Sequence, residues 1–401
     1  MNIYNEIHTP AATDFELHRP GAVSHLPHSV ECGSRWGTYG SSSGWSSEVI
    51  NCAIGEQFER KHFYLDVPVH DTSKLDNGLT PEECDEFSKA FSQTSTNGHK
   101  TPLHSHLFDR TNVFRITDFT PCRIPTVCIS ISPGRNPVDN KFYPMRDTCG
   151  CSAHVTIERA ILGALKESLE RQFLLRFWLT KTCTDKVSYL DACSTLKNLP
   201  SRPLLQQLHK NGELCILNLT DDKFPGSCIL LCYGNKNDKH AHVKYCAGMA
   251  YSDNLASALE KATIELWQTF RFMQSFSSTN NFKKEIEDPY LSYFMECNHY
   301  STYNTISSNI DMSHPKSSSN DTVPLTCQNL ISAIRKLKLN GYLYLSALPT
   351  KKSNIHFCKY TSPNLFLHMN NAFHLNTKNT YSDFFSKKII TTQLTRMVPF
   401  P

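Results

Sequence analysis

The sequence predicts a mixed α/β fold in which a pattern of helix and strand is repeated within the chain. Three segments share one layout, a loop of small residues followed by a helix, and short runs of β-branched and aromatic residues lie between them. The composition is typical of a folded chain, because 39% of the 401 residues are hydrophobic and 19% are charged. A chain of this length forms one large domain or two ordinary ones.

The three predicted helices lie within residues 40–65, 150–179 and 247–273, where apolar residues recur at helical spacing. A serine, a residue favoured as a helix N-cap, stands at or near each transition from loop to helix. In each helix an alanine is followed three and six residues later by acidic or amide side chains. The serines are Ser46, Ser152 and Ser252, and the phased positions are Ala53, Glu56 and Glu59, then Ala164, Glu167 and Glu170, then Ala262, Glu265 and Gln268.

The segments between and after the helices are expected to supply the strands. The stretch 275–321 is rich in serine and asparagine, and we expect it to be a flexible surface insertion. Residues 396–401 form an apolar, proline-spaced tail. The expected strands are residues 125–132, 213–219, 227–233 and 341–345.

Charge and apolar patterning indicate where the protein acts. The net charge is only +4, which is too small and too dispersed to indicate nucleic acid or an anionic membrane as the main partner. No run of about 18 apolar residues is present, and the first residues do not resemble a signal peptide. We therefore expect a cytoplasmic protein whose sixteen cysteines are reduced.

Paired carboxylates are the feature that points to chemistry. Glu56 with Glu59, and Glu167 with Glu170, stand at i and i+3, so each pair lies on one helix face. Bringing two such faces together on largely apolar helices would raise the pKa values of the carboxylates or require cations. Oxygen ligands without imidazole or thiolate suit Mg²⁺ that holds a phosphate-bearing substrate. A single pattern of this kind is usually a solvated helix face. A functional site is favoured because the pattern recurs at the same spacing from an alanine in each of the three helices.

The loops before the helices offer a second, weaker signal. Glycine and serine in residues 40–46 and 150–152 present backbone N–H groups and hydroxyls that suit an anion. Such loops are usually turns, and no Walker sequence is present. No local signature of a nucleophilic enzyme is present either.

Cysteine and histidine clusters are not expected to bind metal. The sequence Cys149-Gly-Cys151-x-x-His154 lacks the separated second pair of ligands that structural zinc sites use. The His-x-His pairs at 104–106 and 240–242 have no third ligand nearby in the sequence, so we expect surface histidines.

Taken together, these motifs resemble those of the YcaO family, ATP-dependent enzymes that activate backbone amides of peptides. The resemblance lies in the two E-x-x-E-R helices, the serine before the second, the later Glu-x-x-Gln helix and the proline-spaced C-terminus. Residues 142–154, 366–371 and 397–401 are similar to the cyclodehydratase subunit of microcin B-type azole-peptide synthetases. The similarity runs from the first helix to the last residue.

The resemblance implies a single domain over residues 1–401, with ATP and Mg²⁺ between the acidic helices. It implies that the tail 396–401 reaches the active site, and that Pro401 either orients or deprotonates the amide or only pins the tail. Arg171 would lie next to the phosphates, and Ser152 in the nucleotide pocket. The implied Mg²⁺ ligands are Glu56, Glu59, Glu167 and Glu170, and the implied nucleotide-binding residues also include Arg60, Glu265 and Gln268.

Two positions depart from the family pattern. Arg159 stands eight residues before Glu167, where many relatives have an acid, and Glu158 lies one step away. In the third helix, Arg271 follows Gln268 by three residues, whereas the family arginine follows by two.

The implied reaction is cyclodehydration of a ribosomally made precursor peptide. A Cys or Ser side chain attacks the preceding amide, ATP phosphorylates the amide oxygen, and loss of phosphate leaves a thiazoline or oxazoline. Such phosphoryl transfer needs mainly positioning and charge neutralisation. The implied partners are a leader-binding scaffold subunit and an FMN-dependent azoline dehydrogenase. The alternatives are another YcaO activation, giving a thioamide or an amidine ring, and a non-catalytic scaffold subunit of the synthetase.

Overall fold

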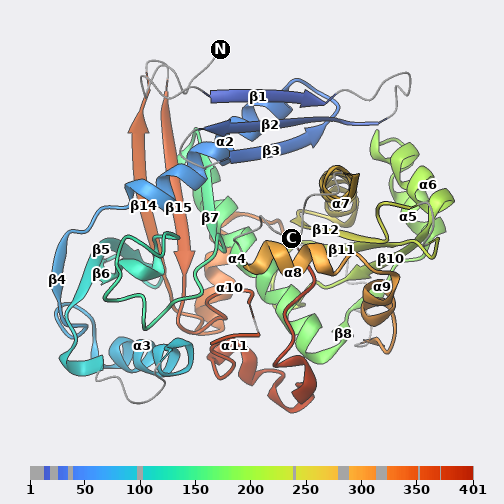
Figure 1. The fold of residues 1–401 in the computed structure, drawn as a ribbon. Coiled ribbons are helices and arrows are strands. Elements are labelled where there is room, and N and C mark those ends of the chain that lie inside the picture. The colour runs from blue at the N-terminus through green and yellow to red at the C-terminus, as the bar shows by residue number, and fades with distance from the viewer. Residues whose placement is uncertain are drawn as a thin grey trace.

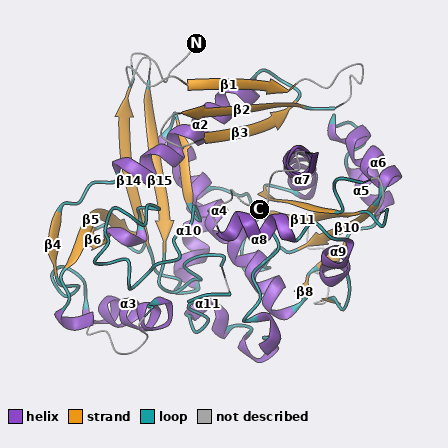
Figure 2. Cartoon of the chain, in the orientation of Figure 1, coloured by secondary structure: helices purple, strands orange, loops and turns teal. Residues whose placement is uncertain are grey.

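The computed structural model describes residues 13–18, 26–34, 39–96, 103–237, 241–278, 289–312, 323–350, 353–370 and 372–400. Its two largest sheets are arranged around a long central helix, and a three-stranded sheet lies against a second helix (Figure 1). The mixed α/β class is confirmed, and Figure 2 shows how helices and strands alternate through the chain.

The six-stranded sheet has the order β4-β5-β14-β15-β7, with β6 paired to β5, and the four-stranded sheet has the order β12-β11-β10-β9. All pairings within these two sheets are antiparallel. The three-stranded sheet is β1 (Thr13–His18), β2 (His28–Ser34) and β3 (Tyr39–Gly44). The other strands are β4 (Asp71–Ser73), β5 (Phe108–Arg115), β6 (Pro121–Pro125), β7 (Cys151–His154), β8 (Thr182–Cys183), β9 (Asp185–Lys186), β10 (Glu213–Asn218), β11 (Ser227–Gly234), β12 (Tyr245–Ser252), β13 (Asp311–Met312), β14 (Tyr342–Pro349) and β15 (Asn354–Thr361).

Three long helices carry the phased acids, and all three helix predictions are confirmed. They are α2 (Glu48–Lys61), α4 (Ile157–Thr180) and α7 (Leu255–Ser278), and a short π-helix (His62–Asp66) continues α2. The remaining helices are α3 (Pro81–Thr94), α5 (Tyr189–Thr195), α6 (Ser201–Asn211), α8 (Pro289–Glu296), α9 (Tyr300–Ser307), α10 (Cys327–Lys336) and α11 (Thr380–Asp383).

The segments that precede the three helices are strands, not the predicted loops. β3 leads into α2, β7 into α4 and β12 into α7. Ser152 and Ser252 therefore lie inside strands and cap no helix; Thr156 is the N-cap of α4, and Asn254 accepts the N–H of Ser257 at 3.0 Å. Ser46 accepts the N–H of Glu48 at 3.3 Å, one residue before the N-cap of α2.

Small residues stand in these strands because strand and helix backbones touch. A Cβ on Gly40 of β3 would lie 2.1 Å from the carbonyl oxygen of Ala53, and one on Gly248 of β12 would lie 2.4 Å from that of Ala262. In the middle unit the glycine is on the helix, where a Cβ on Gly163 would lie 2.3 Å from a strand hydroxyl. The three phased alanines, Ala53, Ala164 and Ala262, are fully buried at these contacts.

This close approach predicts the stability of glycine variants. Gly40→Ala should lower the free energy of unfolding by about 1–3 kcal/mol or more, because the backbones of β3 and α2 must separate. Gly55→Ala is the matched control, since a Cβ at this position in α2 meets nothing within 4 Å. That change should raise the free energy of unfolding by up to about 1 kcal/mol through helix propensity. Urea unfolding measures both, and equal stability of the two variants would contradict the packing argument.

The other strand predictions have mixed outcomes. Strands at 213–219, 227–233 and 341–345 are confirmed as β10, β11 and β14. The strand predicted at 125–132 is wrong beyond Pro125, because residues 126–128 form a 3₁₀ turn. There the N–H groups of Ile129 and Ser130 both donate to the carbonyl of Thr126, so a local turn replaces the ladder.

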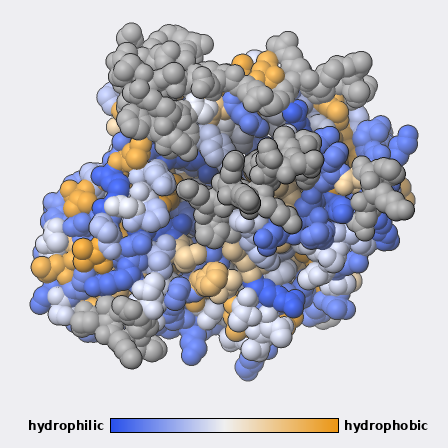
Figure 3. All heavy atoms as spheres, viewed as in Figure 1, coloured by the Kyte–Doolittle hydropathy of each residue, from blue (hydrophilic) through white to orange (hydrophobic). Residues whose placement is uncertain are grey.

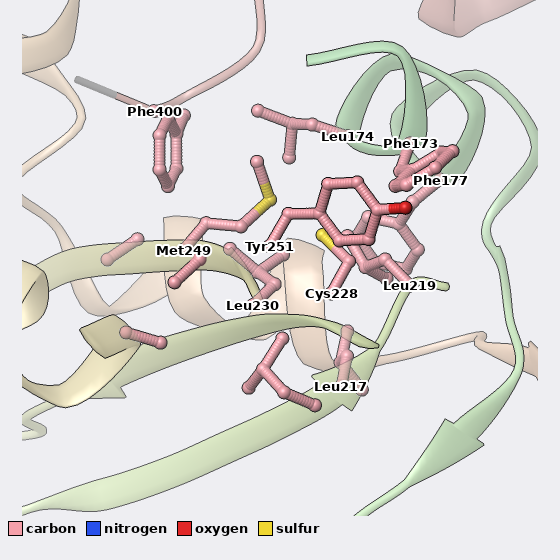
Figure 4. Close-up of a cluster of buried hydrophobic side chains, with 14 of the residues drawn as sticks. Phe173, Leu174, Phe177, Leu217, Leu219, Cys228, Leu230, Met249, Tyr251 and Phe400 are labelled. Carbon is pink, nitrogen blue, oxygen red and sulfur yellow. The ribbon is translucent and has the colours of Figure 1, made fainter. Parts of the chain in front are cut away.

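The core consists of two clusters that meet across the six-stranded sheet. Side chains of β14 and β15 alternate between them: Tyr342 and Phe357 face one cluster, and Leu343 and Cys358 face the other. The first of these clusters is built around α2 and α3, and the second around α4, α7 and the four-stranded sheet. Figure 4 shows part of the second, where Phe173 and Leu174 of α4 lie near Met249 and Tyr251 of β12, and Phe400 of the tail is drawn nearby.

The predicted insertion 275–321 is described over residues 275–278, which end α7, and over residues 289–312, and its flexibility stays a prediction. Residues 289–312 form α8, α9 and β13, and their buried side chains include Phe294 and Tyr303. In the part of the chain that the structure describes, no helix combines the length and apolar character needed to cross a membrane. The visible face is mostly hydrophilic, with scattered apolar patches (Figure 3).

Candidate active site

Acidic side chains of α2, α4 and α7 lie close enough to act on one another, and Figure 1 shows the ribbons of these three helices. Burial, followed by the charge of Glu59, raises the pKa of Glu167, so an acid of α2 acts on an acid of α4. Burial, followed by the charges of Glu170 and Glu56, raises the pKa of Glu265, so acids of α4 and α2 act on this acid of α7. The predicted convergence of the two E-x-x-E faces, and of the third helix with them, is therefore present in the structure.

In α2 and α7, the first acid of the helix accepts a hydrogen bond from a backbone N–H of the strand that precedes that helix. Ser41 of β3 donates to a carboxylate oxygen of Glu56 at 2.7 Å. Met249 of β12 donates in the same way to Glu265 at 3.1 Å. Each acid is thus fixed by its own strand-helix unit.

The second position of each helix is bonded to the next unit, so the three units close into a ring. The N–H of Ala153 in β7 bonds to Glu59 of α2, and the N–H of Tyr251 in β12 donates to Glu170 of α4 at 2.7 Å. Gln268 of α7 completes the ring, because its amide donates to the hydroxyl of Ser41 in β3 at 2.6 Å. The internal repeat is therefore a cyclic arrangement around the acids.

Burial and mutual repulsion raise the pKa values of four of these carboxyl groups. Burial, followed by the charge of Glu56, raises the pKa of Glu59 to about 7. Burial, followed by the charge of Glu170, raises the pKa of Glu265 to about 8. Burial also raises the pKa of Glu167 and of Glu170. Burial and the neighbouring carboxylates thus disfavour the ionised form of these acids, and a bound cation would favour it.

Arg171 is the guanidinium inside this acidic site. Burial opposes its charge, but Glu170 and Glu167 hold its pKa above the usual value. Its guanidinium carbon lies 5.2 Å from the centroid of the Phe400 ring. Its Nη1 atom is buried and has no hydrogen-bond partner in the described part of the chain, so a donor remains for an anionic ligand.

Arg60 lies on the side of the site near β3. It donates to Glu56 at 2.7 Å from Nη2 and at 3.1 Å from Nε, and its guanidinium carbon lies 5.6 Å from the centroid of the Tyr39 ring. Ser152 is half-buried in β7, and its hydroxyl faces α4 at Gly163, one turn before Glu167.

Several predicted positions do not join the acids. Glu158 and Arg159 are exposed in the first turn of α4. Arg271 is half-buried, one turn beyond Gln268 on α7. Pro401 lies outside the described residues.

The cysteine and histidine pairs also have local explanations. All sixteen cysteines are free thiols, and burial raises the pKa of both Cys149 and Cys151, so these thiols stay neutral. His104 and His242 are exposed as expected, and His240 lies outside the described residues. The surface assignment of His106 is wrong, because its ring is bonded to the buried Asp139 at 2.6 Å.

Three lysines near the acids were missed in the sequence analysis. Lys359 of β15 is buried, donates to the carbonyl of Asp147 at 3.1 Å, and lowers the pKa of Glu59. Lys166 and Lys261 lower the pKa of Glu170. Lys166 directly precedes Glu167 in the sequence, and this adjacency could have indicated that Lys166 lies near the acids. Nothing in the sequence marks Lys359 or the backbone donors.

The residues present fit Mg²⁺ and a nucleotide triphosphate. The acids offer hard oxygen ligands, and the free N–H of Arg171 suits a phosphate oxygen. Among the described residues, no three His, Cys, Asp or Glu side chains already form a metal-binding group. Glu56, Glu170 and Glu265 each accept a backbone N–H, and their like charges repel, so a cation is needed to draw oxygens together.

The chain is similar to known proteins in sequence and in fold. A family model described as YcaO cyclodehydratase, ATP- and Mg²⁺-binding, matches residues 51–366. The microcin B17-processing protein McbD of Escherichia coli is 30% identical over 371 residues, which cover 91% of this chain and 90% of that protein. Chains of the E. coli microcin synthetase McbBCD complex, without and with pro-MccB17 bound, match with a TM-score of 0.86 and 29% identity over 96% of both chains.

Proposed function

The chain belongs to the YcaO cyclodehydratase family, which binds ATP and Mg²⁺, and from this premise we propose that it forms thiazoline and oxazoline rings in a ribosomally made precursor peptide. The products would be azole-peptide antibiotics of the bacteriocin type. The observation that carries this proposal is the ring of acids from α2, α4 and α7 around Arg171.

The proposed reaction uses the substrate's own nucleophile. A Cys or Ser side chain adds to the carbonyl carbon of the preceding amide, and the oxygen of this adduct takes the γ-phosphoryl group of ATP, releasing ADP. The adduct then expels phosphate and loses a proton, which leaves the azoline ring. Bound Mg²⁺ would neutralise the charge of the triphosphate during this transfer.

The chain's own residues hold and align the reactants. Arg171 donates its free N–H to the transferring phosphoryl group, where negative charge accumulates. The backbone donors of β3, β7 and β12 fix carboxylates before ligands bind, so little reorganisation is needed during transfer. We assign Glu56, Glu59, Glu167 and Glu170 to Mg²⁺, and Ser152, Arg60, Glu265 and Gln268 to the nucleotide side of the site.

We further propose that the chain works in a hetero-oligomeric synthetase in the cytoplasm. The matched E. coli structure is a complex of three kinds of subunit and has also been solved with a precursor bound, which supports a peptide substrate and protein partners. The partners would be a leader-binding scaffold and an FMN-dependent azoline dehydrogenase. The sixteen free thiols support a reducing compartment.

Mass analysis of the cognate precursor tests the function. The precursor is incubated with the chain, ATP, Mg²⁺ and the partner proteins, and each ring formed removes the mass of one water. Thioamide formation would instead add the difference between sulfur and oxygen. A precursor of unchanged mass, with no precursor-dependent phosphate release, would leave only the scaffold alternative.

A further inference from the structure

The last residues of the chain are held by hydrogen bonds to their backbone rather than by a strand pairing. Trp178 of α4 donates to the carbonyl of Arg396 at 2.9 Å. Tyr293 of α8 donates to the carbonyl of Met397 at 2.9 Å, and the N–H of Phe400 donates to that of Val398 at 2.9 Å.

Two more tyrosines complete the series. Tyr245 of β12 donates to the carbonyl of Pro399 at 2.5 Å, and Tyr290 of α8 donates to that of Phe400 at 2.6 Å. Every backbone carbonyl from 396 to 400 therefore has a donor, and four of the five donors are aromatic side chains. We call Trp178, Tyr245, Tyr290 and Tyr293 the tail collar.

The apolar contacts of the tail would anchor it without this collar. Met397, Val398 and Phe400 are buried, with at most 5% of each exposed. Apolar burial is not directional, so it holds the segment in the core but does not set its path. A hydrogen bond from a tyrosine hydroxyl to a carbonyl is directional, and a tyrosine side chain loses little conformational freedom in making it. The collar therefore determines where the end of the tail points.

The end of the tail meets the acidic site at Arg171. The Phe400 ring lies 5.2 Å from the guanidinium carbon of Arg171, whose pKa is lowered by burial and raised by the charges of Glu170 and Glu167. Tyr290 is the collar member at this junction. Its hydroxyl donates to the carbonyl of Phe400, the residue whose ring lies beside Arg171, and burial raises the pKa of the phenol, so it stays protonated as a donor.

We propose that Tyr290 is a positioning residue of the reaction, which with Tyr245 and Tyr293 holds the C-terminal tail against Arg171 in the geometry that phosphoryl transfer requires. This inference rests on the proposed function. It gives α8, which lies within the segment expected to be a surface insertion, a role in catalysis.

Tyr290→Phe tests the proposal because it removes one hydroxyl and keeps the ring. In the synthetase mixture, kcat for precursor-dependent phosphate release should fall about tenfold, while the KM for ATP stays within about twofold. Tyr360→Phe is the matched control, since the hydroxyl of Tyr360 likewise donates to a backbone carbonyl, that of Leu339 at 2.9 Å, which is not part of the tail. It should lose comparable stability but keep kcat.

A double-mutant cycle separates positioning through the tail from other roles. If Tyr290 acts through the tail, its substitution should lower kcat less in a Pro401→Ala background than in the unaltered chain. Fully multiplicative losses would overturn the proposal, as would a Tyr290→Phe variant with unaltered kcat. If Tyr290→Phe does not fold, Tyr293→Phe is measured by the same criteria.

The two proposals fail in different ways. If the unaltered chain releases no phosphate in response to precursor, the proposed function fails. If it does release phosphate and the collar variants match the Tyr360→Phe control, only the positioning role is overturned.

Discussion

Replacing Glu167 and Glu170 together with Gln should reduce ATP consumption to less than about one-hundredth of the unaltered rate. Gln keeps the size of each side chain but removes two of the negative charges around Arg171, so Mg²⁺ and its triphosphate lose their attraction to the site. Precursor-dependent phosphate release measures the effect. Size-exclusion chromatography with the partners should show unchanged assembly, because both side chains face the interior of the acidic site.

Glu158→Gln is the matched control for this variant. Glu158 lies on the same helix, α4, but is exposed in its first turn. The Glu158→Gln variant should consume ATP at the same rate as the unaltered chain. If the Glu167/Glu170 variant is equally active, the assignment of the acidic site is wrong.

The same double variant should be more stable than the unaltered chain when no ligand is bound. A carboxyl group whose pKa is raised in the folded state stabilises the fold below its ordinary pKa and loses that contribution as the pH rises through the raised value. For Glu59 and Glu265 the ordinary value is 4.5 and the raised values are about 7 and about 8. The ligand-free chain should therefore lose stability between about pH 4.5 and 8.

Urea unfolding across this pH range measures the effect. Removing Glu167 and Glu170 relieves the repulsion that acts on Glu59 and Glu265, so the decline should be shallower in the variant. A steeper decline in the variant would contradict the repulsion argument. A gain in stability combined with a loss of activity would indicate a site whose charge is kept for binding rather than for folding.

Adding a few residues after Pro401 should abolish precursor-dependent phosphate release if the C-terminal residue acts in the reaction. The carbonyl of Phe400 is bonded to Tyr290, and the Phe400 ring lies against Arg171, so added residues must enter the space beside the acidic site. The extended chain keeps every contact of residues 396–400, and its melting temperature should therefore be close to that of the unaltered chain.

The control adds the same residues before Met1, which should leave phosphate release unchanged. A C-terminally extended chain with full activity would refute the catalytic interpretation of Pro401. It would favour the alternative in which the two prolines only fix the path of the tail.

The sequence by itself determined the local structure and the chemical type of the site. The alanine phase identified α2, α4 and α7 and placed Glu56, Glu59, Glu167 and Glu170 on common faces, because a helical face is determined by neighbours three and four residues apart. The absence of imidazole and thiolate among these ligands indicated oxygen chemistry. These are properties of short segments, and a pattern within one segment is sufficient to show them.

Only the tertiary structure decided how the segments meet. The segments predicted as loops are strands. Glycines such as Gly40 and Gly248 are needed there because the strand backbone touches a helix, but small residues are also typical of loops, so the sequence pattern was ambiguous. The ring of backbone donors has no signature, since every residue except proline carries an N–H. The tail collar joins α4, β12 and α8 to the C-terminus over long sequence separations. No local sequence pattern distinguishes its tyrosines from other tyrosines. Contacts between distant segments depend on packing of the whole chain, which no local pattern contains.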